Sequence, residues 1–281
     1  MEITSAASLY NQISIPALSM LGTVLLLLVT LPLAAVTGFF AGFFRRKKLL
    51  AKGKTLDMVV GESTLSAILA LLGLLLAFSF GNALNLSQSR KSTIVDEAAA
   101  LGTVFLRVDY LSEPGRTKLQ LSILEYARTR VLPGNGQIKS LEDAQAFLDK
   151  TLQAQEKLWP LTLEFTADPT PVPIKTFVAG AMNDALDAHL YRVAILSTPV
   201  SDVTLIMMYA GALTALFLLG NRAGMVGRNL TWRTFVFAGF LIMVMGTILD
   251  TQRSNEGFVR TDDTAIRITI FDMEKALADR I

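Results

Sequence analysis

Side chains that could perform acid–base or metal chemistry are scarce in this chain of 281 residues, which has one histidine and no cysteine. The histidine, His189, lies close to Asp184 and Asp187 in the sequence. Asp and His can bind a metal together, but on a helix Asp184 aligns only loosely with His189 and Asp187 points elsewhere. A solvated or interface helix explains the segment better, so the sequence predicts no metal site and no catalytic residue.

Other kinds of chemistry are also excluded. Without cysteine the chain has no disulfide, zinc-thiolate site, iron–sulfur cluster or thiol nucleophile. The segment Gly134–Gly136 is no phosphate loop, because neither GK[ST] nor G-x-G-x-x-G follows a strand there. The 26 basic and 24 acidic residues give a net charge of +2, which is no electrostatic footprint for nucleic acid. We therefore expect a protein that is not an enzyme, needs no cofactor and binds no nucleic acid.

Two stripes of residues in the apolar segment 63–86 are more informative. The first consists of small residues at mostly three- and four-residue spacing, which would let a neighbouring helix approach closely: Ser66, Gly73, Ala77 and Gly81. The second begins apolar and becomes polar toward its C-terminal end: Ala70, Leu74, Phe78, Asn82 and Asn85. A pore with a dry constriction and a wet mouth would suit this second stripe. A lipid-facing phenylalanine with two interfacial amides would explain the same spacing equally well.

The elements that must position these residues are membrane-spanning helices. Hydrophobic residues make up 52% of the chain and charged residues 18%, which is too apolar for an ordinary soluble protein. Four segments have the roughly 20 mostly apolar residues that a spanning helix needs: 13–44, 63–86, 203–220 and 234–249. Pro32 is expected to kink the first helix without ending it. Four spans would put both termini on the same side of the membrane.

The segments between and after the spans are predicted to be helical and outside the bilayer. The second span should continue as a helix to about Glu113, because no proline interrupts it. Apolar spacing within 87–202 predicts further helices at 116–131, 140–158 and 174–196. Pro160 should end the second of these, and 250–281 forms a C-terminal extramembrane segment. The predicted fold class is an all-α membrane protein with four transmembrane helices and a helical extramembrane domain inserted between spans two and three.

Basic residues in the short loops predict the orientation, because Lys and Arg favour the cytoplasmic side. Six lie between spans one and two, and three lie between spans three and four: Arg45, Arg46, Lys47, Lys48, Lys52, Lys54, Arg222, Arg228 and Arg233. The sequence therefore predicts an integral protein of the cell (inner) membrane, with the inserted domain and both termini on the non-cytoplasmic side. The first basic cluster could also bind anionic lipids, although anchoring is the commoner role.

Parts of the sequence are similar to a known family. They read LGLLLAFSF at 72–80 and VDEAAALGTVFLRVDYL at 95–111, followed by LDTQR at 249–253 and GFVR at 257–260. These residues resemble the bestrophin-like family of bacterial membrane proteins, a branch related to the bestrophin ion channels. The layout of two spans, a helical insert and two more spans is similar to that family over nearly the whole chain.

This resemblance implies a homo-oligomeric channel, since bestrophins are pentamers that conduct anions through a pore lined by the second span. When the family's pattern is transferred residue by residue, the constriction falls on Ala70, Leu74 and Phe78. The expected partners are then inorganic ions, in particular anions, together with membrane lipids and further copies of the chain in a ring.

The sequence departs from the bestrophin pattern in three ways. Ser79–Gly81 replaces the asparagine pair of channel members, and the acidic calcium clasp is reduced to Asp262 and Asp263. Bestrophins also keep their insert in the cytoplasm, whereas the basic loops here place it outside. Two functions therefore stay open, a channel and a non-conducting membrane scaffold or sensor whose helical insert binds a partner. A ring lined by span two would favour the channel, and a dimer sealed through the small-residue stripe would favour the scaffold.

Overall fold

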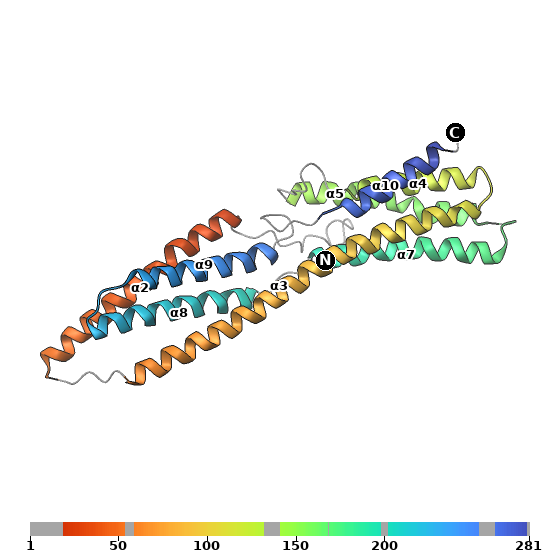
Figure 1. The fold of residues 1–281 in the computed structure, drawn as a ribbon. Helices are drawn as coiled ribbons and strands as arrows, with labels where there is room; N and C mark the ends of the chain where they lie inside the picture. The colour runs from red at the N-terminus through yellow and green to blue at the C-terminus, as the bar shows by residue number, and fades with distance from the viewer. Residues whose placement is uncertain are drawn as a thin grey trace, which may run out of the picture. The chain divides into compact units, whose positions relative to one another are not determined.

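The computed structural model describes residues 19–53, 59–131, 141–167, 169–197, 202–252 and 262–279. These residues form helices and turns, with no β-strand among them. They fall into two compact units, and Figure 1 labels most of their helices. The span unit comprises the described residues within 16–85 and 200–259, and the bundle unit comprises those within 86–199 and 260–281. Helix α3, Val59–Arg107, contributes its first part to the span unit and its second part to the bundle unit.

The span unit confirms the four predicted apolar helices. They are α2 (Met20–Ala51), the first part of α3, α8 (Asp202–Val226) and α9 (Trp232–Gln252). Each of the four helices is long and apolar enough to cross a membrane. The chain is therefore an integral membrane protein.

The bounds of α2 follow from its end residues. The helix begins where the Ser19 hydroxyl accepts a hydrogen bond from the Gly22 amide at 3.2 Å. It continues through Pro32, as expected, and beyond Phe44 into the basic residues as far as Ala51. Lysine and arginine are good helix formers and interact favourably with the C-terminal end of a helix, so the loss of apolar character at Phe44 does not end α2.

Helices α2 and α8 pack backbone against backbone. Gly38 and Gly42 of α2 and Gly220 and Gly224 of α8 line the contact, and a Cβ atom added at any of them would collide with a carbonyl oxygen of the other helix. The residues in contact advance in the same direction along both helices, so α2 and α8 run parallel. The Asn221 side-chain amide also donates a hydrogen bond to the Gly38 carbonyl at 3.5 Å. Glycines four residues apart on both helices make this approach sterically possible.

Only one side of α3 takes part in the apolar core of the span unit. Leu72, Leu76 and Ala83 are buried there against side chains of the other three helices. A Cβ atom at Gly211 of α8 would lie 3.3 Å from Leu72 Cδ1, so the Leu72 side chain reaches the surface of α8. The rest of the core comes from α2, α8 and α9: Leu27, Leu31, Ala35, Met208, Ala212, Ala215, Leu216, Ala238, Leu241, Met245, Ile248 and Leu249.

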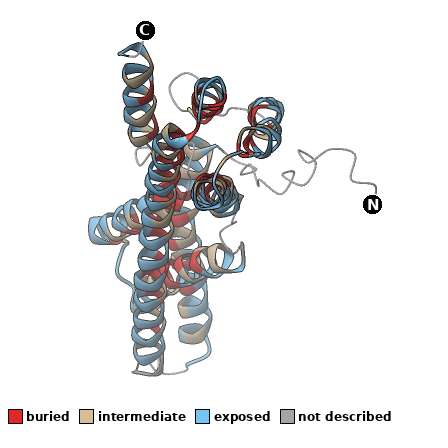
Figure 2. Ribbon diagram, turned by 90° about the vertical axis from the view of Figure 1, so that its right-hand side faces the viewer, coloured by how far each residue is buried: buried red, intermediate tan, exposed pale blue. Residues whose placement is uncertain are grey.

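The bundle unit combines the second part of α3 with shorter helices. These are the 3₁₀-helix η2 (Val108–Tyr110), α4 (Gly115–Thr129), α5 (Leu141–Glu156), α6 (Leu158–Phe165), α7 (Val172–Ser197) and α10 (Thr264–Ala278). Apolar residues recurring every three or four positions turn one side of each helix inward, as the buried stripes in Figure 2 show. Helix α10 packs on α3, where the Thr269 hydroxyl donates a hydrogen bond to the Ala98 carbonyl at 3.4 Å.

Two predictions about the bundle unit had different outcomes. The proline-free stretch does continue the second span, because α3 ends at Arg107 and η2 extends the helical path to Tyr110. The prediction that Pro160 ends a helix was wrong, since α5 ends at Glu156 and Pro160 lies in the first turn of α6. A proline in the first turn costs little, because the amide that it lacks has no intrahelical acceptor there. The expected turn at Gly134–Gly136 lies outside the described residues.

Candidate functional site

The stripe predicted to line a pore lies on the exposed side of α3. Leu74 and Phe78 are 53% and 69% exposed, and Ala70, Asn82 and Asn85 are exposed with them. The opposite side of the helix packs into the core of the span unit. An apolar stripe that the other described residues leave uncovered is typical of a surface that contacts lipid or another subunit.

The predicted small-residue stripe of α3 is exposed as well. Ser66 and Ala77 lie at the surface, and a Cβ atom added to Gly73 or Gly81 would meet no atom within 4 Å. Within the chain the close helix contact uses the glycines of α2 and α8 instead, which the sequence analysis missed. The G-x-x-x-G spacing at 38–42 and 220–224 was the available signal. A packing role for the stripe on α3 stays a prediction about neighbouring subunits.

A further group of candidate residues is buried inside the bundle unit, and the sequence analysis missed three of its four members. The Glu97 carboxylate, on α3, accepts hydrogen bonds from Arg130 Nε and Arg192 Nη1, both at 2.6 Å. Arg130 directly follows α4 and Arg192 lies on α7, so one carboxylate joins three helices. All three side chains are at most 2% exposed. These residues and His189 are called the ionic cluster below.

The sequence predicted that His189 lies on a solvated or interface helix. The structure instead buries this side chain inside the bundle unit, where it is only 3% exposed. Its Nδ1 atom lies 4.0 Å from Glu97 Oε1, and neither ring nitrogen has a hydrogen-bond partner among the described residues. Burial, and after it the charge of Arg130, lowers the pKa of His189 from 6.5 to about 4, against the opposing effect of Glu97. His189 is therefore neutral at pH 7, where the cluster holds one carboxylate against two guanidinium groups.

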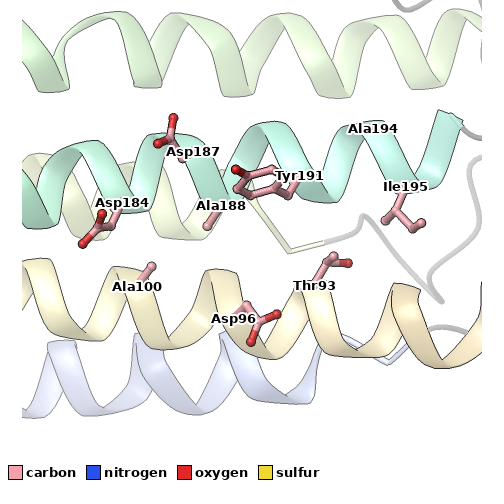
Figure 3. A pocket seen from close by; sticks show the side chains of 9 residues that line it. All are labelled: Thr93, Asp96, Ala100, Asp184, Asp187, Ala188, Tyr191, Ala194 and Ile195. Atoms are coloured by element: carbon pink, nitrogen blue, oxygen red, sulfur yellow. The ribbon is translucent and has the colours of Figure 1, made fainter.

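The two aspartates near His189 in the sequence line a different part of the bundle unit. Asp184 and Asp187 join Asp96 of α3 around a groove of about 680 Å³ between α3 and α7. Figure 3 shows this groove, with Ala100 and Ala188 pointing toward each other across it and Asp187 pointing away from α3. Thr93, Tyr191, Ala194 and Ile195 complete the lining. Among the described residues, no three His, Asp or Glu side chains are placed to hold a metal ion.

The acidic residues that stand in place of a calcium clasp are engaged at the start of α10. Asp262 Oδ1 accepts hydrogen bonds from the amide and the hydroxyl of Thr264, at 2.9 and 2.6 Å. Asp263 Oδ1 lies 2.9 Å from Arg267 Nε, one turn along the helix. Asx-type bonding and an i,i+4 ion pair of this kind stabilise a helix N-terminus.

The fold and these sites define an all-α integral membrane protein with an uncovered apolar stripe on one spanning helix and a buried ionic cluster in a helical bundle. Within that class, the chain belongs to the bestrophin-like family, because the family model described as the bestrophin-like domain matches residues 29–266. The match includes α3, the ionic cluster and the glycine contact between α2 and α8. Neither the comparison with curated proteins nor the comparison with solved structures gave a match.

Proposed function

We propose that this chain forms a homo-oligomeric ion channel in which α3 of each subunit lines the pore. The observation that carries the proposal is the apolar stripe on α3, whose largest side chain, Phe78, is 69% exposed while the opposite side of the helix is packed. Membership of the bestrophin-like family supports it. The spanning segments supply the other helices that would separate such a pore from lipid.

The order of residues along the stripe suits a gate that works by dewetting. Ala70, Leu74 and Phe78 would form successive apolar rings around the axis, and Asn82 and Asn85 would form a polar mouth one and two turns further on. An apolar ring that is too narrow to stay wet repels ions, because each ion would have to lose part of its hydration shell. The amides of the mouth would replace part of that shell.

The oligomer proposed is a closed ring, with five subunits by resemblance to bestrophins. Cyclic symmetry turns one lining helix per subunit into a continuous wall around a single axis. The small-residue stripe on α3 leaves its backbone accessible, so helices of neighbouring subunits could approach closely there. The same resemblance implies anions as the permeant ions.

We further propose that the bundle unit lies outside the bilayer on the non-cytoplasmic side. Helix α2 ends in the basic residues of the first short loop, which would anchor that end at the cytoplasmic surface. The bundle unit has an apolar core of its own and carries ion pairs on its surface, such as Arg128 with Glu274, so it needs no lipid around it.

The pore assignment is tested by ion flux through the purified protein in liposomes. Phe78→Ala should raise flux, because the apolar ring widens and becomes hydrated, whereas Asn82→Leu should lower flux by extending the dry zone. Phe80→Ala is the matched control, since Phe80 lies two residues further along α3 on a different side of the helix and should leave flux unchanged.

The outcome also separates the channel from the alternative function. Flux that is absent from the wild type and from every variant, at matched oligomer content, would favour a non-conducting scaffold or sensor. Flux that rises equally in Phe78→Ala and Phe80→Ala would mean that α3 is loosened rather than that a ring of Phe78 side chains is opened.

A further inference from the structure

The ionic cluster connects three helical segments inside the bundle unit through buried ion pairs. Among the ion pairs between described residues, those of Glu97 with Arg130 and Arg192 have both partners almost fully buried. Arg192 Nη1 also donates to the Arg130 carbonyl at 3.4 Å, so the end of α4 and helix α7 are joined directly as well. Removing one partner of such a buried pair leaves an uncompensated charge in the interior.

His189 lies beside these buried charges, so the protonation of its ring would change the net charge of the cluster. Around it are Glu97 on α3, Arg130 at the end of α4, and Arg192 one turn further along α7. The Tyr126 ring of α4 lies 6.3 Å from the imidazole, between ring centroids. Asp263, which precedes α10, interacts electrostatically with Arg192 and forms an ion pair with Arg267.

We propose that protonation of His189 is an acid switch that loosens the packing of α3 against α4 and α7, and thereby regulates conduction along α3. A protonated ring adds a third positive charge to a site that holds two guanidinium groups and one carboxylate. Both ring nitrogens of the protonated ring carry a hydrogen, so Nδ1, which lies 4.0 Å from Glu97 Oε1, would also compete with Arg130 Nε for that oxygen. Both effects act against the packed arrangement, because the added charge has no counter-ion of its own.

The size of the effect follows from the two protonation states. The packed arrangement binds a proton on His189 only near pH 4, whereas a loosened arrangement that exposes the ring to water binds it near pH 6.5. The loosened arrangement therefore binds more protons throughout that window, and acid favours it. Between pH 7.5 and pH 5 the equilibrium should shift toward the loosened arrangement by about thirtyfold.

The link to conduction rests on the proposed function, but the loosening itself does not. The chain has no cysteine, so nitroxide labels can be attached at two introduced sites alone. Thr103→Cys on α3 and Leu190→Cys on α7 are both at exposed positions, where a label disturbs no packing. The distance between the labels is then measured by electron paramagnetic resonance in the full chain at pH 7.5 and pH 5, and liposome flux is measured at the same pH values.

The wild type should show a longer or broader distance distribution at pH 5, with a midpoint between pH 6.5 and pH 4. His189→Gln, which cannot be protonated, should lose this response, and Asp187→Asn, an exposed carboxylate two residues earlier, should keep it. A distance that is the same at both pH values in the wild type overturns the switch, and so does a response that survives in His189→Gln.

The two proposals can fail separately. Ion flux without any pH-dependent change in label distance would support the proposed channel and contradict the proposed acid switch. A pH-dependent change in label distance with no ion flux at any pH would support the acid-induced loosening of the bundle unit and contradict the proposed channel. If His189→Gln does not fold, the single histidine resonance of the wild type gives the answer, since a ring that titrates near pH 6.5 without a change in distance contradicts the proposal.

Discussion

Replacing Glu97 by glutamine should destabilise the bundle unit strongly, because the substitution keeps the shape of the side chain and removes the only carboxylate that both arginines contact in the ionic cluster. Arg130 and Arg192 would each be left with a buried charge, since their side chains are only 2% exposed. Breaking a buried pair by removing one partner costs about 3–5 kcal/mol. For a chain of this size, that corresponds to a fall in Tm of roughly 6–20 °C.

The control is the same substitution in an ion pair of the same length at the surface. Glu274 Oε1 lies 2.6 Å from Arg128 Nη2, and Glu97 Oε1 lies 2.6 Å from Arg130 Nε. The side chains of Glu274 and Arg128, however, are 44% and 58% exposed. Glu274→Gln should cost roughly 0–1 kcal/mol. Helical circular dichroism during heating, in one detergent, measures both variants. Equal Tm values for the two variants would refute the argument that burial makes the Glu97 pairs matter.

A second comparison tests whether the cost comes from charge rather than from lost packing. Glu97→Leu combined with Arg130→Met and Arg192→Met removes all three charges together and keeps the interior filled. Replacing a buried ionic triad by apolar residues of similar volume is often neutral or stabilising. The triple variant should therefore melt above Glu97→Gln, and a triple variant that melts below it would show that the shape of the ionic residues dominates.

Two further predictions concern the span unit and the orientation. Gly220→Ala should cost about 3 kcal/mol or more, because its Cβ would collide with the Ala35 carbonyl. Gly239→Ala on α9 is the control, since a Cβ at Gly239 would meet no described atom of a neighbouring element within 4 Å. The yields of folded protein from the two variants are compared. A cysteine at the exposed Ser112 should react with an impermeant reagent in intact cells, and one at the exposed Lys52 only after the membrane is breached. The reverse pattern would establish a cytoplasmic bundle unit.

The sequence predicted the spans because their signals are local. A run of about 20 apolar residues identifies a spanning helix without reference to any other part of the chain. The continuation of α3 beyond the membrane was predictable for the same reason, since it needed only the absence of proline. Pro160 shows the limit of such reasoning, because a proline can stand in the first turn of a new helix as well as after the last turn of an old one.

The ionic cluster was less predictable because it depends on distant residues. Glu97 does carry a local signal, as it lies on the buried side of α3 near Ile94, Ala98 and Leu101, where a carboxylate needs a buried partner. The identity of that partner is not local, since Arg130 is 33 residues away and Arg192 is 95 residues away. The chain contains 26 basic residues, and only the packing of α4 and α7 selects these two.

One helix connects the two sites, and this makes regulation of the one by the other physically reasonable. Phe78 and Glu97 lie on the same helix, α3, and are 19 residues apart in the sequence. The proposed regulation would run along α3, because this helix is continuous in sequence from one residue to the other. The thirtyfold shift expected from His189 corresponds to about 2 kcal/mol, within the usual range of coupling between two sites. The pH dependence of ion flux is therefore compared between the wild type and His189→Gln. A pH response that only the wild type shows would mean that protonation of His189 changes conduction along the stripe around Phe78, and this measurement is independent of the distance between the labels on α3 and α7.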